Sequence, residues 1–105
     1  MRCMRVMVFF DLPVKSKKDR KAYTDFRRDL LKMGFTMVQY SIYSRTVKNS
    51  DDAVKYENLV EKIVPPNGAV RMMTVTEKQY ASIRILAGER MKSENLLDTK
   101  DILEL

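Results

Sequence analysis

The fold is decided by residues 2–13, which read Arg2-Cys3-Met4-Arg5-Val6-Met7-Val8-Phe9-Phe10-Asp11-Leu12-Pro13. Apolar residues dominate this stretch up to Phe10, a pattern typical of a strand buried in the middle of a sheet. Pro13 cannot donate a backbone hydrogen bond to a neighbouring strand, so we expect the strand to end before it. The other elements are placed outward from this central strand.

A helix is predicted over residues 16–33. Ser16 is a candidate N-cap, and Asp19 falls in the first turn, where the positive end of the helix dipole favours a carboxylate. An apolar stripe at helical spacing is expected to pack on the sheet, and it consists of Tyr23, Phe26, Leu30 and Met33. Gly34 is a typical residue to follow a helix end.

Residues 35–47 are rich in aromatic and β-branched residues and predict strand structure. Alternation puts Val38, Tyr40 and Ile42 on one face of a single strand. The stretch is long for one strand, so it either continues straight or folds back near residues 39–41. The second alternative has no Gly or Pro to mark the turn.

The second half of the chain predicts a helix and more strands. Asn49 or Ser50 caps a helix with a loose apolar stripe of Val54, Leu59 and Ile63. The run Pro65-Pro66-Asn67-Gly68 predicts a turn. After it we expect a strand over 69–76, a helical turn over 76–80, and a short strand over 83–87 that ends at Gly88.

The order of elements predicts an α+β fold. If residues 35–47 form two strands, the order is βαββαβ, a ferredoxin-like arrangement with two helices on one face of an antiparallel sheet and an additional short C-terminal strand. This domain spans residues 1–88. Nothing in the chain covers the other face of the sheet, so we expect a homodimer. The tail, residues 89–105, ends in an apolar patch that we expect to dock on a partner or on the second subunit, formed by Ile102, Leu103 and Leu105.

Length and composition restrict the function. With 105 residues the chain makes one domain, and with no histidine it has neither His-based catalysis nor His metal ligands. Its single cysteine excludes an internal disulfide, and no apolar run is long enough to span a membrane. A cytoplasmic protein with no membrane association is expected. Residues 1–50 carry twelve Lys or Arg and four Asp or Glu, a net charge of +8, whereas residues 51–105 carry eight and ten, a net charge of −2.

The basic half of the chain suggests a polyanion as partner. Seven cations fall on or just before the first predicted helix: Lys15, Lys17, Lys18, Arg20, Lys21, Arg27 and Arg28. A basic face of this kind can follow the phosphates of a duplex, although a solvated helix face has the same pattern. Tyr40, Tyr43 and Tyr80 are either base-stacking platforms or, as we favour, packing residues.

Asp11 is the candidate catalytic residue and metal ligand. It ends the central strand, at a sheet rim where ligands are often bound. One carboxylate is a poor Mg²⁺ site, but a two-fold dimer brings a second Asp11 and can complete it. The alternative is that Asp11 only hydrogen-bonds the turn before Pro13.

Four stretches of the sequence resemble the CRISPR-associated protein 2 family, the small core protein of spacer acquisition. They are Met4–Pro13, Arg20–Arg27, Gly34–Ser44 and Thr74–Tyr80, and the last is similar to the version found with type II systems. The resemblance runs from about residue 2 to residue 88, and the order and spacing of the stretches make it specific.

The resemblance implies a ferredoxin-like homodimer with two described activities. One is metal-dependent cleavage of RNA or DNA, in which the paired strand-end aspartates correspond to Asp11 and Mg²⁺ is the expected ion. The other is architectural, since the dimer bridges the CRISPR integrase and lies along duplex DNA. By this resemblance Lys15, Lys17, Lys18 and Arg20 contact phosphates. Arg27 and Arg28 lie on the same basic helix and are candidate nucleic-acid contacts by their charge. The resemblance also implies that residues 102–105 dock on the integrase. The absence of other catalytic groups favours the architectural activity.

Overall fold

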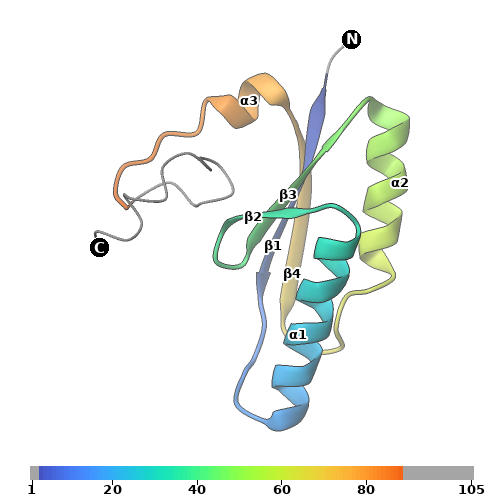
Figure 1. Ribbon diagram of the computed structural model, residues 1–105, viewed down its shortest axis with the longest axis vertical. Coiled ribbons are helices and arrows are strands. Elements are labelled where there is room, and N and C mark those ends of the chain that lie inside the picture. The colour runs from blue at the N-terminus through green and yellow to red at the C-terminus, as the bar shows by residue number, and fades with distance from the viewer. Residues whose placement is uncertain (1–2, 89–105) are drawn as a thin grey trace.

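The computed structural model describes residues 3–88, which form a four-stranded sheet and three helices (Figure 1). The elements follow in the order β1 (Met4–Asp11), α1 (Lys17–Lys32), β2 (Thr36–Gln39), β3 (Ile42–Val47), α2 (Ser50–Glu61), β4 (Ala69–Thr76) and α3 (Glu77–Ala81). The strands lie in the order β2-β3-β1-β4, and every neighbouring pair is antiparallel. The predicted ferredoxin-like fold is confirmed.

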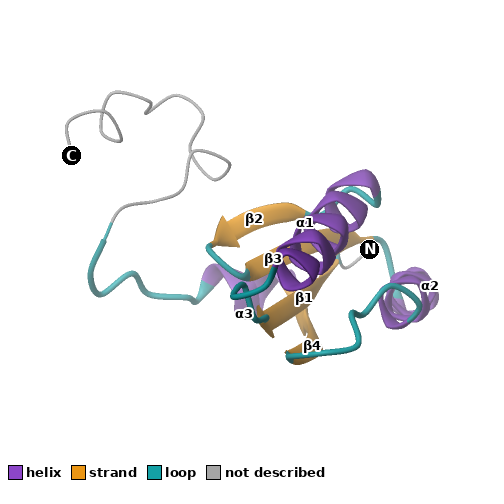
Figure 2. Cartoon of the chain, turned by 90° about the horizontal axis from the view of Figure 1, so that it is seen from below, coloured by secondary structure: helices purple, strands orange, loops and turns teal. Residues whose placement is uncertain are grey.

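β1 lies between β3 and β4, as its apolar sequence predicts. Val6, Val8 and Phe10 point to one side of the sheet and are buried in the core. Figure 2 shows α1 and α2 together on one side of the sheet. The Phe10 ring contacts Phe26 of α1, with centroids 5.1 Å apart, and lies 5.6 Å from the Tyr43 ring of β3. The core therefore lies between the sheet and these two helices.

Both long helices begin at the predicted caps. The Ser16 side chain accepts from the Asp19 backbone N–H, and the Asp19 carboxylate accepts from the Ser16 N–H, which makes a capping box. Asn49 caps α2 through the N–H of Asp52. Phe26 and Leu30 of the predicted α1 stripe are buried.

The predicted apolar stripe of α2 is wrong in part, because Val54 is 50% exposed. The buried face holds Ala53 and Val60 in place of Val54 and Leu59, with Tyr56 and the predicted Ile63 packed against the core. Tyr56 belongs to this face because its hydroxyl accepts from Arg45 Nη2 at 2.6 Å and its ring lies under the same guanidinium. A polar contact, which an apolar pattern does not reveal, therefore accompanies the apolar contacts of α2 with the core.

Residues 35–47 fold back on themselves, so the two-strand alternative is confirmed. The turn falls at Tyr40 and Ser41, and Ser41 has a positive φ of 68°. A serine in the left-handed region is uncommon, which is why the sequence carries no clear turn signal. The register also shifts between Met37 and Gln39. The predicted common face of Val38, Tyr40 and Ile42 is therefore wrong, because Tyr40 belongs to the turn.

The predicted short strand over residues 83–87 is not formed in the single chain. After α3 this segment leads away from β4 (Figure 1), and its apolar side chains are exposed, among them Ile83, Ile85 and Leu86. A strand requires a neighbouring strand for its backbone hydrogen bonds, and the part of the chain that the structure describes offers none to this segment. The predicted docking residues Ile102, Leu103 and Leu105, like the rest of residues 89–105, lie outside the described residues.

Candidate nucleic-acid interface

Asp11 is the last residue of β1 and is exposed. It pairs with Ala69 across the ladder, and the turn before β4 comes very close to it. A Cβ atom at Gly68 would lie 2.8 Å from the Asp11 carbonyl oxygen and 2.8 Å from Leu12 Cδ2, and Gly68 has a φ of +97°. Only glycine fits these two conditions without strain. The Asp11 carboxylate makes no hydrogen bond or ion pair within residues 3–88, so it does not serve the turn before Pro13 there.

An open hollow of 440 Å³ adjoins Asp11. The turn between β2 and β3 forms one side of it, because the Phe10 backbone N–H donates to the Ser41 carbonyl oxygen at 3.0 Å. Strand alternation places Phe9 and Asp11 of β1 on the side of the sheet opposite Val8 and Phe10. The hollow is lined by Phe9, Phe10, Asp11, Tyr40, Ser41, Ile42, Ala69 and Arg71.

Arg71 is a site residue that the sequence does not reveal. It is exposed and pairs with Phe9 in the ladder between β1 and β4, so it lies two positions along β4 from Ala69, the partner of Asp11. Its guanidinium makes no ion pair within the described part of the chain. Arg71 could have been found from the sequence only by predicting how the strands pair. If β4 is placed antiparallel to β1 with Ala69 opposite Asp11, Arg71 falls near Asp11.

Asp11 fits a divalent cation as one oxygen ligand. Within residues 3–88, no three Asp, Glu, Cys or His side chains gather closely enough to hold a metal ion. Mg²⁺ is commonly held by one or two protein carboxylates together with water and substrate phosphates. One chain therefore supplies part of such a site, and the remaining oxygens have to come from a second copy or from the substrate.

The predicted phosphate-binding cations fall into two groups. Lys15, Lys17 and Lys18 are exposed, and so is Arg27, and their side chains have no polar partner within residues 3–88. Lys17 and Lys18 lie in the first turn of α1, where the dipole is already positive. This placement concentrates positive potential at the start of α1, an arrangement suited to anions.

The other cations have partners in the protein. Arg20 Nη1 donates to the carbonyl oxygens of Val14 at 3.2 Å and Lys15 at 2.9 Å, which ties the loop to the helix. Arg28 contacts Asp25 at 3.1 Å and Asp29 at 3.2 Å. Arg20 therefore has a structural role in the loop, and Arg28 is partly neutralised.

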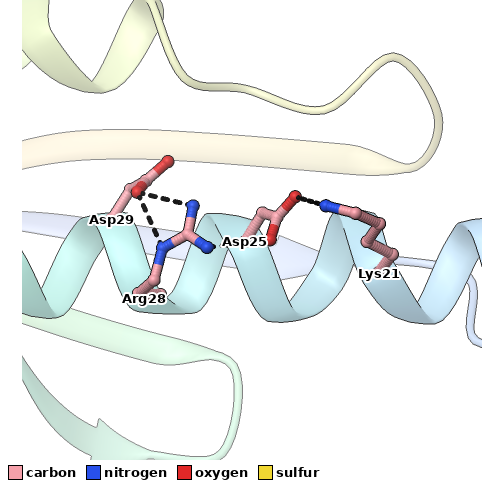
Figure 3. A network of polar contacts seen from close by, with 4 residues as sticks. All are labelled: Lys21, Asp25, Arg28 and Asp29. Carbon is pink, nitrogen blue, oxygen red and sulfur yellow. Dashed lines mark hydrogen bonds and ion pairs between the residues drawn. The ribbon is translucent and has the colours of Figure 1, made fainter.

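Asp25 also holds Lys21, at 2.8 Å, in the network drawn in Figure 3. The hydrogen bond from Lys21 lowers the pKa of the Asp25 carboxyl, and the charges of Lys21 and Arg28 lower it further. The carboxyl consequently stays ionised at neutral pH, and it competes with any phosphate for both cations.

The three candidate tyrosines have different surroundings. Tyr43 is 1% exposed and belongs to the core, and Tyr80 lies beneath the Arg5 guanidinium, 3.9 Å from ring centroid to Cζ. The packing interpretation is right for both. Tyr40 is 80% exposed at the rim of the hollow, so it packs against little of the chain.

Comparison of the sequence with known proteins identifies the family to which this chain belongs. The family model described as CRISPR associated protein Cas2 matches residues 4–83, most of the chain. The chain belongs to the Cas2 family. The match confirms the resemblance inferred from the sequence, and it covers β1 with Asp11, the basic part of α1, and β4 with Arg71.

Curated relatives named CRISPR-associated endoribonuclease Cas2 are similar over most of their length. The protein from Acidovorax ebreus is 46% identical over 99 residues, which cover 94% of this chain and 97% of the relative. The Treponema denticola protein is 49% identical over 86 residues, or 82% and 85% of the two chains. The Ligilactobacillus salivarius protein is 42% identical over 89 residues, or 85% and 88%. Within residues 3–88 of this Cas2 family member, no helix is long and apolar enough to cross a membrane.

Proposed function

We propose that this Cas2 family protein acts in the cytoplasm as a homodimeric scaffold, which binds duplex DNA and bridges the CRISPR integrase during spacer acquisition. The observation that carries the proposal is the cluster of unpartnered lysines at the start of α1, Lys15, Lys17 and Lys18. Their contacts with phosphates position a duplex without reading its sequence. Ile102, Leu103 and Leu105 are proposed to dock on the integrase.

The sheet face opposite α1 and α2 supports the proposed homodimer. By register this face includes Phe9, Ile42 and Met73, and Met73 is 51% exposed. The expectation that nothing in the chain covers this face is wrong in part, because α3 contacts Arg5 of β1 there and Met7 is only 6% exposed. Within residues 3–88, β4 has a neighbouring strand on one side only, so its outer edge is open there to a strand such as the apolar segment 83–87 of a second copy. A second copy facing this side buries the apolar surface and brings two Asp11 residues and two lysine clusters into one particle.

Neutralising the cluster tests duplex binding. The combined variant Lys15→Gln, Lys17→Gln and Lys18→Gln should bind duplex DNA roughly tenfold more weakly, because it loses three surface contacts of about 0.5 kcal/mol each. The slope of log affinity against log salt should flatten by about 2.7 per chain. Fluorescence anisotropy of a labelled duplex over a salt series measures both quantities. Arg20 is left in place because it holds the loop.

The control variant removes the same charge elsewhere. Lys48, Lys55 and Lys62 are exposed in and around α2, and their combined change to Gln should alter the affinity far less. If both triple variants weaken binding equally, net charge alone explains the affinity and the proposed contact surface is wrong. Spacer integration by the reconstituted complex should fail with the α1 variant and persist with the control.

Removing the charge of Asp25 should strengthen duplex binding, whereas removing the lysine charges should weaken it. Asp25→Asn removes one negative charge and releases Lys21 and Arg28, so duplex affinity should rise by roughly threefold in dilute salt, the equivalent of one surface ion pair. The gain should disappear at high salt. The same anisotropy assay measures it, and Asp51→Asn is the matched control. Unchanged affinity at every salt concentration would place both cations away from the DNA.

The duplex affinities of Asp25→Asn and the unchanged protein should be compared at neutral pH. Because the folded-state pKa of Asp25 is lowered, its ion pairs contribute fully above the unfolded carboxyl's pKa. They are lost only as the pH falls through the lowered folded value. Titration of Asp25 therefore does not affect measurements near neutrality.

A second candidate function is metal-dependent endonuclease activity on RNA or DNA. The unpartnered Asp11 carboxylate in the hollow favours it, and the relatives are named endoribonucleases. A divalent ion such as Mg²⁺, when bound, polarises a phosphodiester and activates water. In the dimer, the two Asp11 carboxylates supply oxygens for that ion, and Arg71 holds the phosphate by charge.

A further inference from the structure

A small apolar slot opens on the helix side of the sheet, opposite to the face proposed for the dimer. It lies between the N-terminal half of α1 and the turn that joins α2 to β4, which run side by side in Figure 1. The apolar lining of the slot consists of Leu12, Pro13, Ala22, Tyr23, Pro65 and Pro66. Half of these residues are prolines, which offer no backbone N–H, so the slot suits an apolar group.

Contacts with the core fix the walls of the slot. Leu12 is 9% exposed, and the Phe10 ring meets the Tyr23 ring edge-on, with centroids 6.0 Å apart. The turn comes so close to Leu12 that a Cβ atom at Gly68 would lie 2.8 Å from Leu12 Cδ2. The slot is therefore formed before any group enters it, which lowers the ordering cost of binding. Its volume of about 30 Å³ accepts the end of one side chain, whereas pockets for small ligands measure about 300–1,000 Å³.

The rim of the slot is positively charged. Lys18 lines it, is exposed, and has no polar partner for its side chain within residues 3–88. Lys17 precedes it in the first turn of α1, where the helix dipole adds positive potential. The carboxylate of Asp19 also lies at the rim, but it accepts from the Ser16 N–H in the capping box. The slot therefore suits an apolar side chain that has carboxylates beside it in sequence.

Residues 101–105 of this chain have that composition. They read Asp101-Ile102-Leu103-Glu104-Leu105, with two carboxylates and no cation. When extended, residues 89–101 reach up to about 43–47 Å from Gly88. The longest dimension of the molecule is 40 Å, so this length is enough for the segment to reach the slot.

We propose that residues 101–105 dock in the slot of the free protein, with an apolar side chain inside it and the two carboxylates beside Lys17 and Lys18. In this state the segment competes with duplex phosphates for the same lysines. This competition rests on the scaffold function, which assigns the two lysines to DNA.

The proposed integrase contact and the slot use the same apolar residues of the segment. They are Ile102, Leu103 and Leu105. A segment that is bound to the integrase is therefore absent from the slot, and the lysines at the rim are free. Integrase binding in this way raises the affinity of the scaffold for a duplex, because a larger fraction of the protein is competent to bind.

Carbodiimide crosslinking of the full chain tests where the segment lies, because this reagent joins an amine to a carboxylate that is in contact with it. Mass spectrometry of the unchanged protein should find residues 101–105 joined to Lys17 or Lys18. The pair of Lys21 and Asp25, 2.8 Å apart, is the internal positive control.

Two leucine substitutions on α1 show whether the slot holds the segment. Ala22→Leu fills the slot without a change of charge, so the crosslink to residues 101–105 should be lost. Thr24→Leu adds the same side chain at an exposed position of α1 outside the slot, and the crosslink should persist.

Duplex affinity of the full chain, measured by anisotropy without the integrase, tests the competition. The combined variant Ile102→Ser, Leu103→Ser and Leu105→Ser should bind duplex about tenfold more tightly, the factor expected if one molecule in ten is open in the unchanged protein. Ala22→Leu should give a similar gain, and adding it to the serine variant should give no further gain, because both remove the same contact. The serine variant leaves residues 3–88 unchanged, so a folding defect of Ala22→Leu does not decide the result.

Several results would overturn the proposal. One is the absence of the 101–105 crosslink in a sample in which Lys21 is joined to Asp25. Another is a crosslink from Lys18 to a different acidic segment, which would assign the slot to another occupant. Unchanged duplex affinity in the serine variant would overturn the competition. Failure of the scaffold function is distinguishable, because the serine variant would then bind no duplex, and the crosslink does not depend on DNA.

Discussion

Phe10→Ala is expected to destabilise the protein by about 3–5 kcal/mol, the usual cost of removing a buried phenylalanine ring. Phe10 is 6% exposed and lies among the rings of Tyr23, Phe26 and Tyr43. A domain of this kind has a total stability of about 5–15 kcal/mol, so the loss is a large share of it. Urea denaturation followed by circular dichroism measures the change.

Phe9→Ala is the matched control, because Phe9 is the neighbouring residue on the opposite face of the sheet. It is only partly buried and lies outside the helix-side core. Its loss should cost much less in dilute protein, and any further cost should grow with protein concentration if Phe9 contributes to a dimer. If the two variants have equal midpoints in dilute protein, the helix-side core is not the main source of stability.

Phe10→Ala should also affect the proposed DNA-binding surface at the start of α1. Phe26 belongs to α1, and its contact with Phe10 is one of the contacts that fix this helix on the sheet. A looser α1 presents Lys17 and Lys18 less rigidly, so Phe10→Ala should also bind duplex DNA more weakly than the unchanged protein at a temperature where both remain folded. Rigid presentation lowers the ordering cost of binding.

The sequence was sufficient for the elements whose signals are local. The apolar run of β1, the cap at Ser16 and the turn at 65–68 each depend on residues close together in the chain, and all are confirmed. The fold class followed from their order. The position of Asp11 at the end of a central strand was predictable for the same reason.

The sequence did not predict features that depend on contacts between residues far apart in the chain. Arg71 is placed near Asp11 by the register between β1 and β4, in which Arg71 pairs with Phe9. Tyr56 lies on the buried face of α2 with its hydroxyl bonded to Arg45 of β3, a contact between different elements. The segment 83–87 has the composition of a strand, but it has no partner strand within residues 3–88. Lys17 is free to contact a phosphate, whereas Arg20 donates to backbone carbonyl oxygens of the preceding loop. The amino-acid composition does not reveal this difference.

Asp11→Asn is expected to lower the rate of metal-dependent cleavage by roughly 100-fold or more, if the protein is an endonuclease. A carboxylate that helps to hold the cation contributes several kcal/mol to charge stabilisation in the transition state, and about 2.7 kcal/mol corresponds to 100-fold. The fold should be unaffected, because the Asp11 carboxylate is exposed and has no partner within residues 3–88. Cleavage of a labelled RNA in single-turnover assays with Mg²⁺ measures the effect.

The control for Asp11→Asn is Asp51→Asn, the same chemical change at an exposed aspartate in the first turn of α2. It should cleave like the unchanged protein. Residual cleavage in Asp11→Asn equal to that of the control would exclude Asp11 as a metal ligand and with it the endonuclease candidate at this hollow.

Duplex affinity, measured on the same preparations, distinguishes the scaffold function from the endonuclease function. Because Asp11→Asn removes a negative charge, it should bind DNA at least as tightly, and a scaffold should still support spacer integration. A variant that binds and integrates but does not cleave would show that the two activities use the same dimer through different residues.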